Sequence, residues 1–465
     1  MRLKLLYFKM SMSSINKESD TSFEEKGLEN AENILETENN SKLEESITKS
    51  YLNINNNSEI SAILNLCSSA FGAGCLSFPH CLDSIGIFNS LLVFMFVAGS
   101  IYFSLELLRN FVVDTQYSSF SVITETILGK NWLVVYSITI FICYLSVNIN
   151  YMNVNYSIFR TAFKQDGYKR YVFDILFLII TFALEIFMCL YTKEIKNLHV
   201  LSMIIVLIFF VFILIIIIGG IKGINSEKFE FEKLFNPFGD KKPYDIFFEF
   251  INASILFIYG LAYHSTFPTF IDNIKPNNYT ISKKINIISF GIICLSYIII
   301  SFFGYLFNKE VPEVLFLQNV EQPDNFTNTV LQTIIFVMLF CLIPFRYITI
   351  RDGYKCLITE EKFNDKIDLI ITAICLFIAN IIVFIDAEII RGNGKNYNIF
   401  EIFTNIFGGF LGIIICFLLP VINYVAINGK AKFKSIIGYI ISIFYILVGM
   451  LSVYYSIHKI KNSHN

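Results

Sequence analysis

The chain has 465 residues, of which 55 % are hydrophobic and 16 % are charged, and its formal net charge is −2. Soluble domains carry roughly 25 % charged residues, so this chain has too few to cover a water-facing surface. The small net charge gives no basis for binding nucleic acid. Together with a mean hydropathy of +0.59, the composition indicates a membrane protein with many transmembrane helices, whose surroundings are a lipid bilayer.

A polar N-terminal tail precedes the apolar part of the chain. Residues 1–57 are rich in Ser, Asn, Glu and Lys, and they cannot bury enough apolar surface to offset their conformational entropy. We therefore expect them to be disordered. No sustained apolar core or small-residue cleavage site follows the first residues, so no signal peptide is predicted. Residues 458–465 are expected to form a short polar C-terminal tail.

Apolar runs recur along residues 58–457, which we expect to form one transmembrane domain. A helix needs roughly 20 apolar residues to cross the hydrocarbon core. About eleven such runs are found, near residues 60–80, 86–108, 132–153, 171–191, 199–220, 246–270, 286–307, 328–348, 367–386, 399–427 and 436–456. The fold class is therefore an all-α polytopic membrane protein.

The distribution of basic residues gives only weak evidence for which side of the membrane each loop lies on. Basic residues counted over whole loops are nearly even on the two sides, but clusters next to helix ends, such as NGKAKFK at 428–434, favour a cytoplasmic N-terminus. This orientation places Arg109, Lys193 and Lys355 in cytoplasmic loops. The membrane is expected to be the plasma membrane or an internal vacuolar membrane.

The first apolar run contains an unusual stretch, SSAFGAGCLSFP, with Gly72 and Gly74 ahead of Pro79. Glycine weakens a helix and proline breaks one. Backbone groups freed at mid-membrane are tolerated only where they line a cavity or are buried in protein. The start of the following half-helix then directs its positive dipole at an anion. We predict a non-helical break that binds a carboxylate; the alternative is that the glycines only permit close helix packing.

Ionisable residues inside apolar runs are costly and therefore functional hypotheses. Glu106 and Glu185 nevertheless lie near the ends of their runs, from which a carboxylate reaches the interface, and this interpretation is favoured. Arg346 is expected to snorkel to the interface or to pair with a cytoplasmic carboxylate. Nine cysteines lie in or beside apolar runs and are expected to be free thiols. No metal-ligand spacing or phosphate loop occurs, so no metal, cofactor or catalytic residue is expected.

Four motifs, in matching order, resemble those of the amino acid/auxin permease family. In the first helix the resemblance is carried by Asn65, Ser68, Gly72, Gly74, Leu76, Pro79 and Gly86. In the sixth and eighth helices it is carried by Ala262, His264, Pro268 and Asp272, and by Pro344 and Arg346. In the tenth it is carried by Gly408, Gly409, Gly412 and Pro420.

This resemblance implies a fold of two inverted five-helix repeats plus one extra helix, like that of the bacterial leucine transporter. Helices one and six are corresponding members of the two repeats, and both are interrupted here, which is the best sequence indication of a binding site. The implied function is a secondary transporter that moves amino acids by alternating access. An amino-acid sensor, using the same site without transport, is the alternative. An enzyme is not expected.

The expected site joins helices one and six. The substrate carboxylate would meet backbone N–H groups of helix one, and its ammonium would meet carbonyl groups of both helices. The resemblance also implies that a tyrosine of helix three closes over the substrate; its asparagine neighbours could instead only join helices. The expected substrate-binding residues are Ser69, Gly72, Ala73, Gly74, Cys75, Tyr144, Tyr259, Gly260 and Leu261.

Coupling or gating is expected to involve Asn65, Ser68 and His264. Sodium-coupled relatives place a hydroxyl on helix eight opposite a hydroxyl or amide on helix one, as the resemblance implies. Here residues 337–340, upstream of Pro344, are Val, Met, Leu and Phe. Proton coupling or facilitated exchange is therefore expected instead of sodium coupling. A histidine titrates near neutral pH unless burial shifts it, although a lone histidine on a helix is more often structural.

Overall fold

The computed structural model describes residues 59–115, 117, 119–163, 168–192, 195–224, 235, 238, 241–272, 274, 278–307, 326–358, 365–385, 403–429 and 432–462. The chain divides into two units, Met1–Asn56 and Asn57–Asn465, and all described residues belong to the second unit. The predicted disorder of residues 1–57 concerns residues outside this described part.

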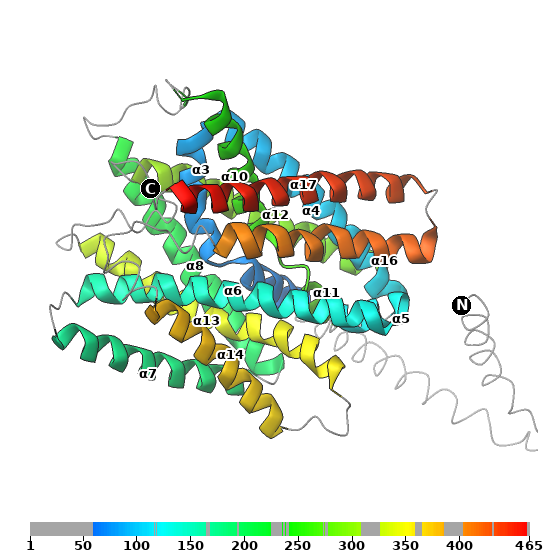
Figure 1. Ribbon diagram of the computed structural model, residues 1–465, viewed down its shortest axis with the longest axis horizontal. Coiled ribbons are helices and arrows are strands. Elements are labelled where there is room, and N and C mark those ends of the chain that lie inside the picture. The colour runs from blue at the N-terminus through cyan, green and yellow to red at the C-terminus, as the bar shows by residue number, and fades with distance from the viewer. Residues whose placement is uncertain are drawn as a thin grey trace, which may run out of the picture. The chain divides into compact units, whose positions relative to one another are not determined.

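Every described regular element is a helix (Figure 1). Ten helices are long and apolar enough to span a membrane, and a bent pair, Glu59–Ala70 and Ala73–Ile85, brings the spans in the described residues to eleven. The others are α4 (Ile87–Thr115), α6 (Lys130–Ala162), α7 (Tyr168–Tyr191), α8 (Ile195–Ile224), α10 (Pro243–Leu261), α12 (Tyr279–Phe307), α13 (Phe326–Leu357), α14 (Asp365–Ile385), η3 (Thr404–Leu411) with η4 (Ile414–Leu418) and α16 (Leu419–Asn428), and α17 (Phe433–Asn462). The eleven predicted helices are confirmed.

The helix ends differ from those predicted, because hydropathy marks the membrane-crossing part of a helix and not its full length. Helix α17 continues to Asn462, so residues 458–462 of the expected polar C-terminal tail are helical. Arg109 lies inside α4 and Lys355 inside α13, and neither residue is in a loop. The sequence also missed α5 (Phe120–Leu128), a short helix between two spans.

The first span is broken where the glycines predict it. The helix Glu59–Ala70 ends before Gly72, whose φ and ψ of −173° are those of an extended chain. A 3₁₀ turn, η1 (Ala73–Ser77), then leads into α3 (Phe78–Ile85), and the two halves meet at 50°. Pro79 lies in the first turn of α3, where the missing N–H has no helical partner to lose. The predicted break is confirmed, although Gly74 itself lies in the 3₁₀ turn.

The sixth span is interrupted in the same way, but slightly later than predicted. Helix α10 ends at Leu261, residues 262–266 are not helical, and the short helix α11 (Phe267–Asp272) follows. Gly260 is therefore the penultimate residue of α10. Because the last carbonyl groups of a helix have no intrahelical partner, this end of α10 still presents free acceptors at the break.

Neighbouring helices enclose the two broken spans. Helix α6 packs against α13, α12 packs against α8 and α3, and α10 packs against α4 and α17. In Figure 1, α7 and α14 lie on one side of α6, and α16 and α17 lie on the other. Exposed apolar side chains such as Ile179, Phe187 and Ile440 cover α7 and α17. A surface of this kind is stable against lipid and not against water.

Candidate functional site between the two broken helices

The two broken helices touch at Gly74 and Gly260. A Cβ atom on Gly74 would lie 2.8 Å from the Cα atom of Gly260 and 3.0 Å from the ring of Tyr259. Real Cβ atoms essentially never approach a backbone atom as closely as the first of these distances, so glycine is required for the two spans to lie so close together. The close approach places the break of the first span directly beside the end of α10.

A tyrosine of α12 joins the two breaks. The Tyr297 hydroxyl donates to the carbonyl oxygen of Ala70 at 2.7 Å, and it lies 3.1 Å from the carbonyl oxygen of Gly260. Each of these carbonyl groups is the last or nearly the last of its helix and has no intrahelical partner. Tyr297 is fully buried, so its hydroxyl replaces the water that these groups would otherwise need.

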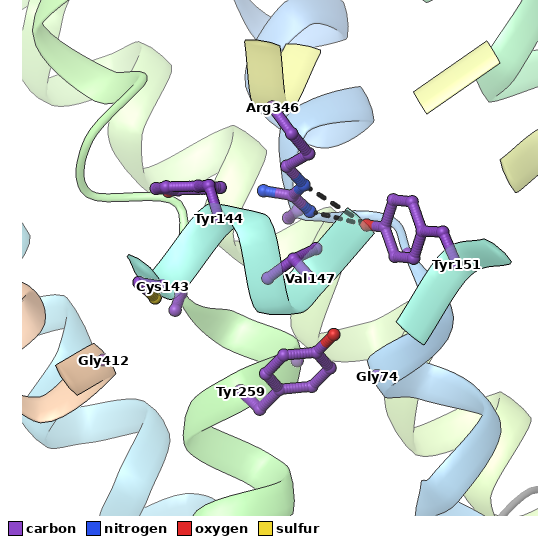
Figure 2. A pocket seen from close by; sticks show the side chains of 12 residues that line it. Gly74, Cys143, Tyr144, Val147, Tyr151, Tyr259, Arg346 and Gly412 are labelled. Carbon is purple, nitrogen blue, oxygen red and sulfur yellow. Dashed lines mark hydrogen bonds between the residues drawn. The ribbon is translucent and has the colours of Figure 1, made fainter. Parts of the chain in front are cut away.

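A small cavity lies beside the breaks, and the centre of a water molecule can reach about 30 Å³ of it. This volume suffices for one or two water molecules and is smaller than an amino acid, so the cavity must widen before it holds one. Its lining, drawn in Figure 2, consists of Ala70, Gly72, Gly74, Cys143, Tyr144, Val147, Tyr151, Tyr259, Gly260, Ala262, Arg346 and Gly412.

Arg346 reaches into this cavity from α13. Its side chain is 5 % exposed, and its Nε and Nη2 atoms donate to the Tyr151 hydroxyl at 3.2 and 3.0 Å. The guanidinium lies 5.8 Å from the centre of the Tyr144 ring and 5.9 Å from that of Tyr151. The expectation that Arg346 snorkels or pairs with a cytoplasmic carboxylate is wrong, because α13 continues to Leu357 and keeps this residue in the interior.

Tyrosines form most of the polar lining. The hydroxyl groups of Tyr144 and Ser265 are hydrogen-bonded, which ties α6 to the non-helical residues after α10. The Tyr259 hydroxyl accepts a hydrogen bond from the Asn150 amide at 3.2 Å. The same amide donates to Thr404 of η3 at 3.1 Å, so these side chains link α6, α10 and the tenth span.

Five of the nine expected substrate-binding residues line the cavity, namely Gly72, Gly74, Tyr144, Tyr259 and Gly260. The other four are buried beside it. Ser69 donates to the Leu66 carbonyl at 2.8 Å, and the Cys75 thiol lies 3.0 Å from the Gly72 carbonyl. Ala73 and Leu261 are fully buried core residues. A substrate contact by any of these four residues would therefore have to use backbone atoms.

The residues expected to couple or gate transport lie away from the cavity lining. Asn65 is hydrogen-bonded to Ser202 of α8, and the Ser68 hydroxyl lies 2.8 and 3.1 Å from the Leu64 and Ser202 carbonyl oxygens, within donating distance of both. His264 is 1 % exposed, and neither of its ring nitrogens has a hydrogen-bond partner among the described residues.

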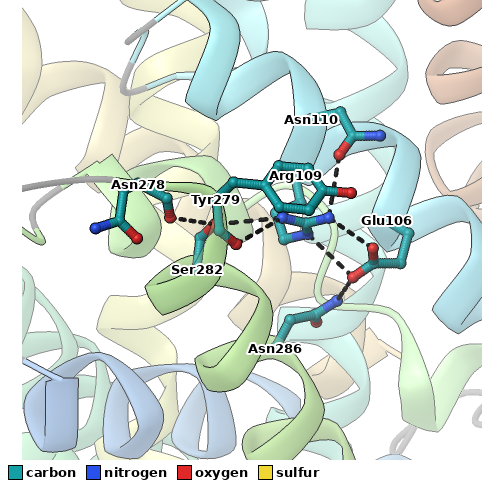
Figure 3. Close-up of polar contacts among 7 residues, drawn as sticks. All are labelled: Glu106, Arg109, Asn110, Asn278, Tyr279, Ser282 and Asn286. Atoms are coloured by element: carbon teal, nitrogen blue, oxygen red, sulfur yellow. Dashed lines mark hydrogen bonds and ion pairs between the residues drawn. The ribbon is translucent and has the colours of Figure 1, made fainter.

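The two intramembrane glutamates have different surroundings. Glu106 pairs with Arg109 at 2.7 Å and accepts from Asn286 at 2.9 Å, in the α4–α12 cluster shown in Figure 3. Glu185 is 1 % exposed and accepts from the Asn380 amide of α14 at 2.8 Å. The expectation that Glu185 reaches the interface is wrong, because α14 covers it.

Sequence reasoning missed Arg346, Tyr151 and Tyr297 as residues of this region. The sequence could have indicated Tyr151, because its spacing from Tyr144 puts both tyrosines on the same face of a helix. An arginine eleven residues before a helix end is not a typical snorkelling residue, but the extent of α13 was not visible in the sequence. Tyr297 had no signal, since its partners are backbone carbonyl groups of other helices.

Comparisons with known proteins identify the family and the fold of the chain. The model of the family described as transmembrane amino acid transporter protein matches residues 55–460. No curated protein matches the chain. A manganese transporter of Eremococcus coleocola, crystallised with an aromatic bis-isothiourea substituted compound, is similar with a TM-score of 0.53 and 13 % identity, over 86 % of this chain and 87 % of that chain.

A second solved structure, the substrate-bound outward-open state of a Na⁺-coupled sialic acid symporter, is similar with a TM-score of 0.54 and 12 % identity. The alignment covers 86 % of this chain and 88 % of that chain. At these identities the likeness shows the shared fold, which is the inverted-repeat fold of leucine-transporter-type transporters. The chain belongs to the transmembrane amino acid transporter family, and it is an integral membrane protein that crosses the bilayer many times.

Proposed function

We propose that the protein is a secondary active transporter that moves amino acids across a membrane by alternating access between its two repeats. The observation that carries this proposal is the contact of two broken helices at Gly74 and Gly260 beside a central cavity. Discontinuous helices at corresponding positions of two repeats form the substrate site in transporters of this architecture. The match to the family over residues 55–460 supports amino acids as the substrate class.

In this proposal the substrate binds between the first span, α6, α10 and α13. Its ammonium group meets carbonyl groups at the end of α10, among residues 259–261, and Tyr144 and Tyr259 pack against its side chain. The Gly260 carbonyl oxygen lies 3.1 Å from the Tyr297 hydroxyl, and its two lone pairs let it accept a hydrogen bond from the substrate as well. The helix break supplies N–H groups for the carboxylate, as at other helix N-termini.

We further propose that transport is coupled to protons or is facilitative, and that it is not coupled to sodium. A sodium ion without its water shell needs a set of oxygen ligands, and leaving it under-coordinated in a buried site costs several kcal/mol. Met338 and Leu339 of α13 are buried apolar residues. The single hydrogen of the Ser68 hydroxyl is already engaged with a carbonyl group, since the Leu64 and Ser202 carbonyl oxygens lie 2.8 and 3.1 Å away.

Uptake into proteoliposomes is expected to continue when choline replaces sodium, and to depend on pH. His264 is the candidate proton carrier, because it lies at the break between α10 and α11 and its ring nitrogens have no described partner that would hold it in one protonation state. His264→Ala is therefore expected to flatten the pH profile of uptake of a labelled amino acid. Loss of uptake on sodium removal contradicts the first expectation, and an unchanged pH profile in His264→Ala contradicts the second.

The same vesicles test the function itself. Accumulation of a labelled amino acid inside vesicles supports a transporter. Saturable binding to the purified protein without any flux supports the sensor instead. A protein that neither binds nor moves any of the twenty amino acids would contradict both functions.

Deletion of residues 1–55 is expected to leave the affinity for substrate unchanged. The reason is that the family match begins at residue 55 and the cavity lining begins at Ala70. Binding of a labelled amino acid to full-length and truncated protein in detergent measures the effect. A large loss of affinity in a truncated protein that still melts cooperatively would show that the tail contributes to the site.

A further inference from the structure

The cavity contains a positive charge that no group in the described part of the chain neutralises. Arg346 is the one charged residue among the described residues that line the cavity. No described carboxylate forms an ion pair with it, and its hydrogen bonds go to the neutral hydroxyl of Tyr151. A buried charge without a counter-ion is strongly destabilising. An anion that entered the cavity would remove this cost.

The guanidinium is also placed to bind such an anion. Its Nε and Nη2 atoms share one acceptor, whereas Nη1 has no partner among the described residues. In Figure 2 the nitrogen without a dashed line points toward Tyr144, on the opposite side from Tyr151. The Nη2 atom lies 3.4 Å from the position of a Cβ on Gly72, so the charge sits beside the helix break. A planar guanidinium binds carboxylates through two parallel hydrogen bonds.

Net charge distinguishes between classes of amino acid. A zwitterionic amino acid brings no net charge, so the occupied cavity would keep the charge of Arg346. A cationic amino acid would add a second positive charge. A dicarboxylic amino acid brings a net charge of −1, so the occupied cavity becomes neutral. In a site shielded from water this difference is large, because the Coulomb energy rises as the dielectric constant falls.

We propose that Arg346 binds a carboxylate of the substrate and that the protein selects dicarboxylic amino acids such as glutamate and aspartate. This inference rests on the proposed transport function and adds its substrate class. One carboxylate binds Arg346, and the second binds the N–H groups of the first-span break. The Tyr144 and Tyr151 rings lie 5.8 and 5.9 Å from the guanidinium, within the range of a cation–π contact.

The experiment compares uptake of glutamate with glutamine, and of aspartate with asparagine, by the full-length protein in proteoliposomes. Each pair has nearly the same shape and differs by one negative charge. Wild-type protein is expected to prefer the acid over its amide by roughly tenfold to a hundredfold, the range for a charge-assisted hydrogen-bonded pair. Arg346→Gln is expected to lose this preference, and Arg346→Lys to retain part of it.

Tyr151→Phe is the matched control, because it removes the present partner of Arg346 and leaves the charge. This variant is expected to keep the preference for the acids. Thermal unfolding in detergent, with and without glutamate, shows whether each variant folds and binds. If Arg346→Gln does not fold, the wild-type ratios and those of Arg346→Lys still decide the question.

The outcomes separate the two proposals. Uptake of glutamine equal to that of glutamate by wild-type protein overturns the assignment of substrate class but leaves amino acid transport intact. An unchanged acid preference in folded Arg346→Gln overturns the role of Arg346. Absence of uptake for every amino acid overturns the transport function itself.

Discussion

Replacing Gly74 with alanine is expected to lower the initial rate of substrate uptake roughly 5- to 150-fold. The added Cβ would lie 2.8 Å from the Cα atom of Gly260 and 3.0 Å from the Tyr259 ring. The Cα of Gly260 is a backbone atom and cannot rotate away as a side chain can. The two broken spans must therefore move apart to make room for the Cβ. Overpacking of this kind costs about 1–3 kcal/mol. If this cost falls on one conformation of the transport cycle, the population of that conformation drops about 5- to 150-fold. Initial uptake rates in proteoliposomes measure the effect.

The matched controls are Gly99→Ala and Gly291→Ala. Both glycines lie in membrane-spanning helices, α4 and α12, and a Cβ at either position meets nothing within 4 Å. Alanine also has a higher helix propensity than glycine, so neither change should destabilise the fold. Uptake by both controls is expected to equal that of wild type. Gly74→Ala with wild-type uptake would mean that the contact with Gly260 does not limit transport.

Tyr297→Phe is expected to lower uptake about tenfold and to reduce the thermal stability of the protein. The change keeps the ring, which packs against Phe78 with the ring centres 5.0 Å apart. It removes the hydroxyl shared by the Ala70 and Gly260 carbonyl groups, which lie 2.7 and 3.1 Å away. A buried acceptor left without a donor costs about 1–3 kcal/mol. Uptake rates and the midpoint of thermal unfolding measure the two effects.

Tyr454→Phe serves as the control for the loss of a tyrosine hydroxyl. Tyr454 lies on α17 and is 57 % exposed, so it is not part of the buried core. Both uptake and unfolding midpoint are expected to be unchanged in this variant. If Tyr297→Phe also behaved like wild type, the two breaks would not depend on a shared hydrogen-bond donor.

The sequence by itself determined the number of spans and the place of the first break. Long apolar runs specify membrane helices because unpaired backbone groups cannot face lipid. All eleven predicted helices occur in the structure. The break at Gly72 was also predictable, since local backbone propensity alone favours an interruption there. The break in the sixth span was located to within a few residues of its end at Leu261.

Only the tertiary structure decided which side chains meet at the site. Gly74 and Gly260 are 186 positions apart, and their contact depends on how α10 packs against η1. The rotation of the first helix turns Asn65 and Ser68 toward Ser202 of α8. Such a rotation follows from packing between helices, which hydropathy does not record.

Arg346 is the clearest case in which the sequence alone did not predict where a side chain lies. Its sequence neighbours are those of a helix end, and the sequence alone therefore indicated an interfacial arginine. In the structure α13 continues for eleven residues beyond it, so the side chain points into the cavity and donates to Tyr151 of α6. Whether a charge in an apolar run faces lipid, interface or cavity depends on the neighbouring helices that shield it.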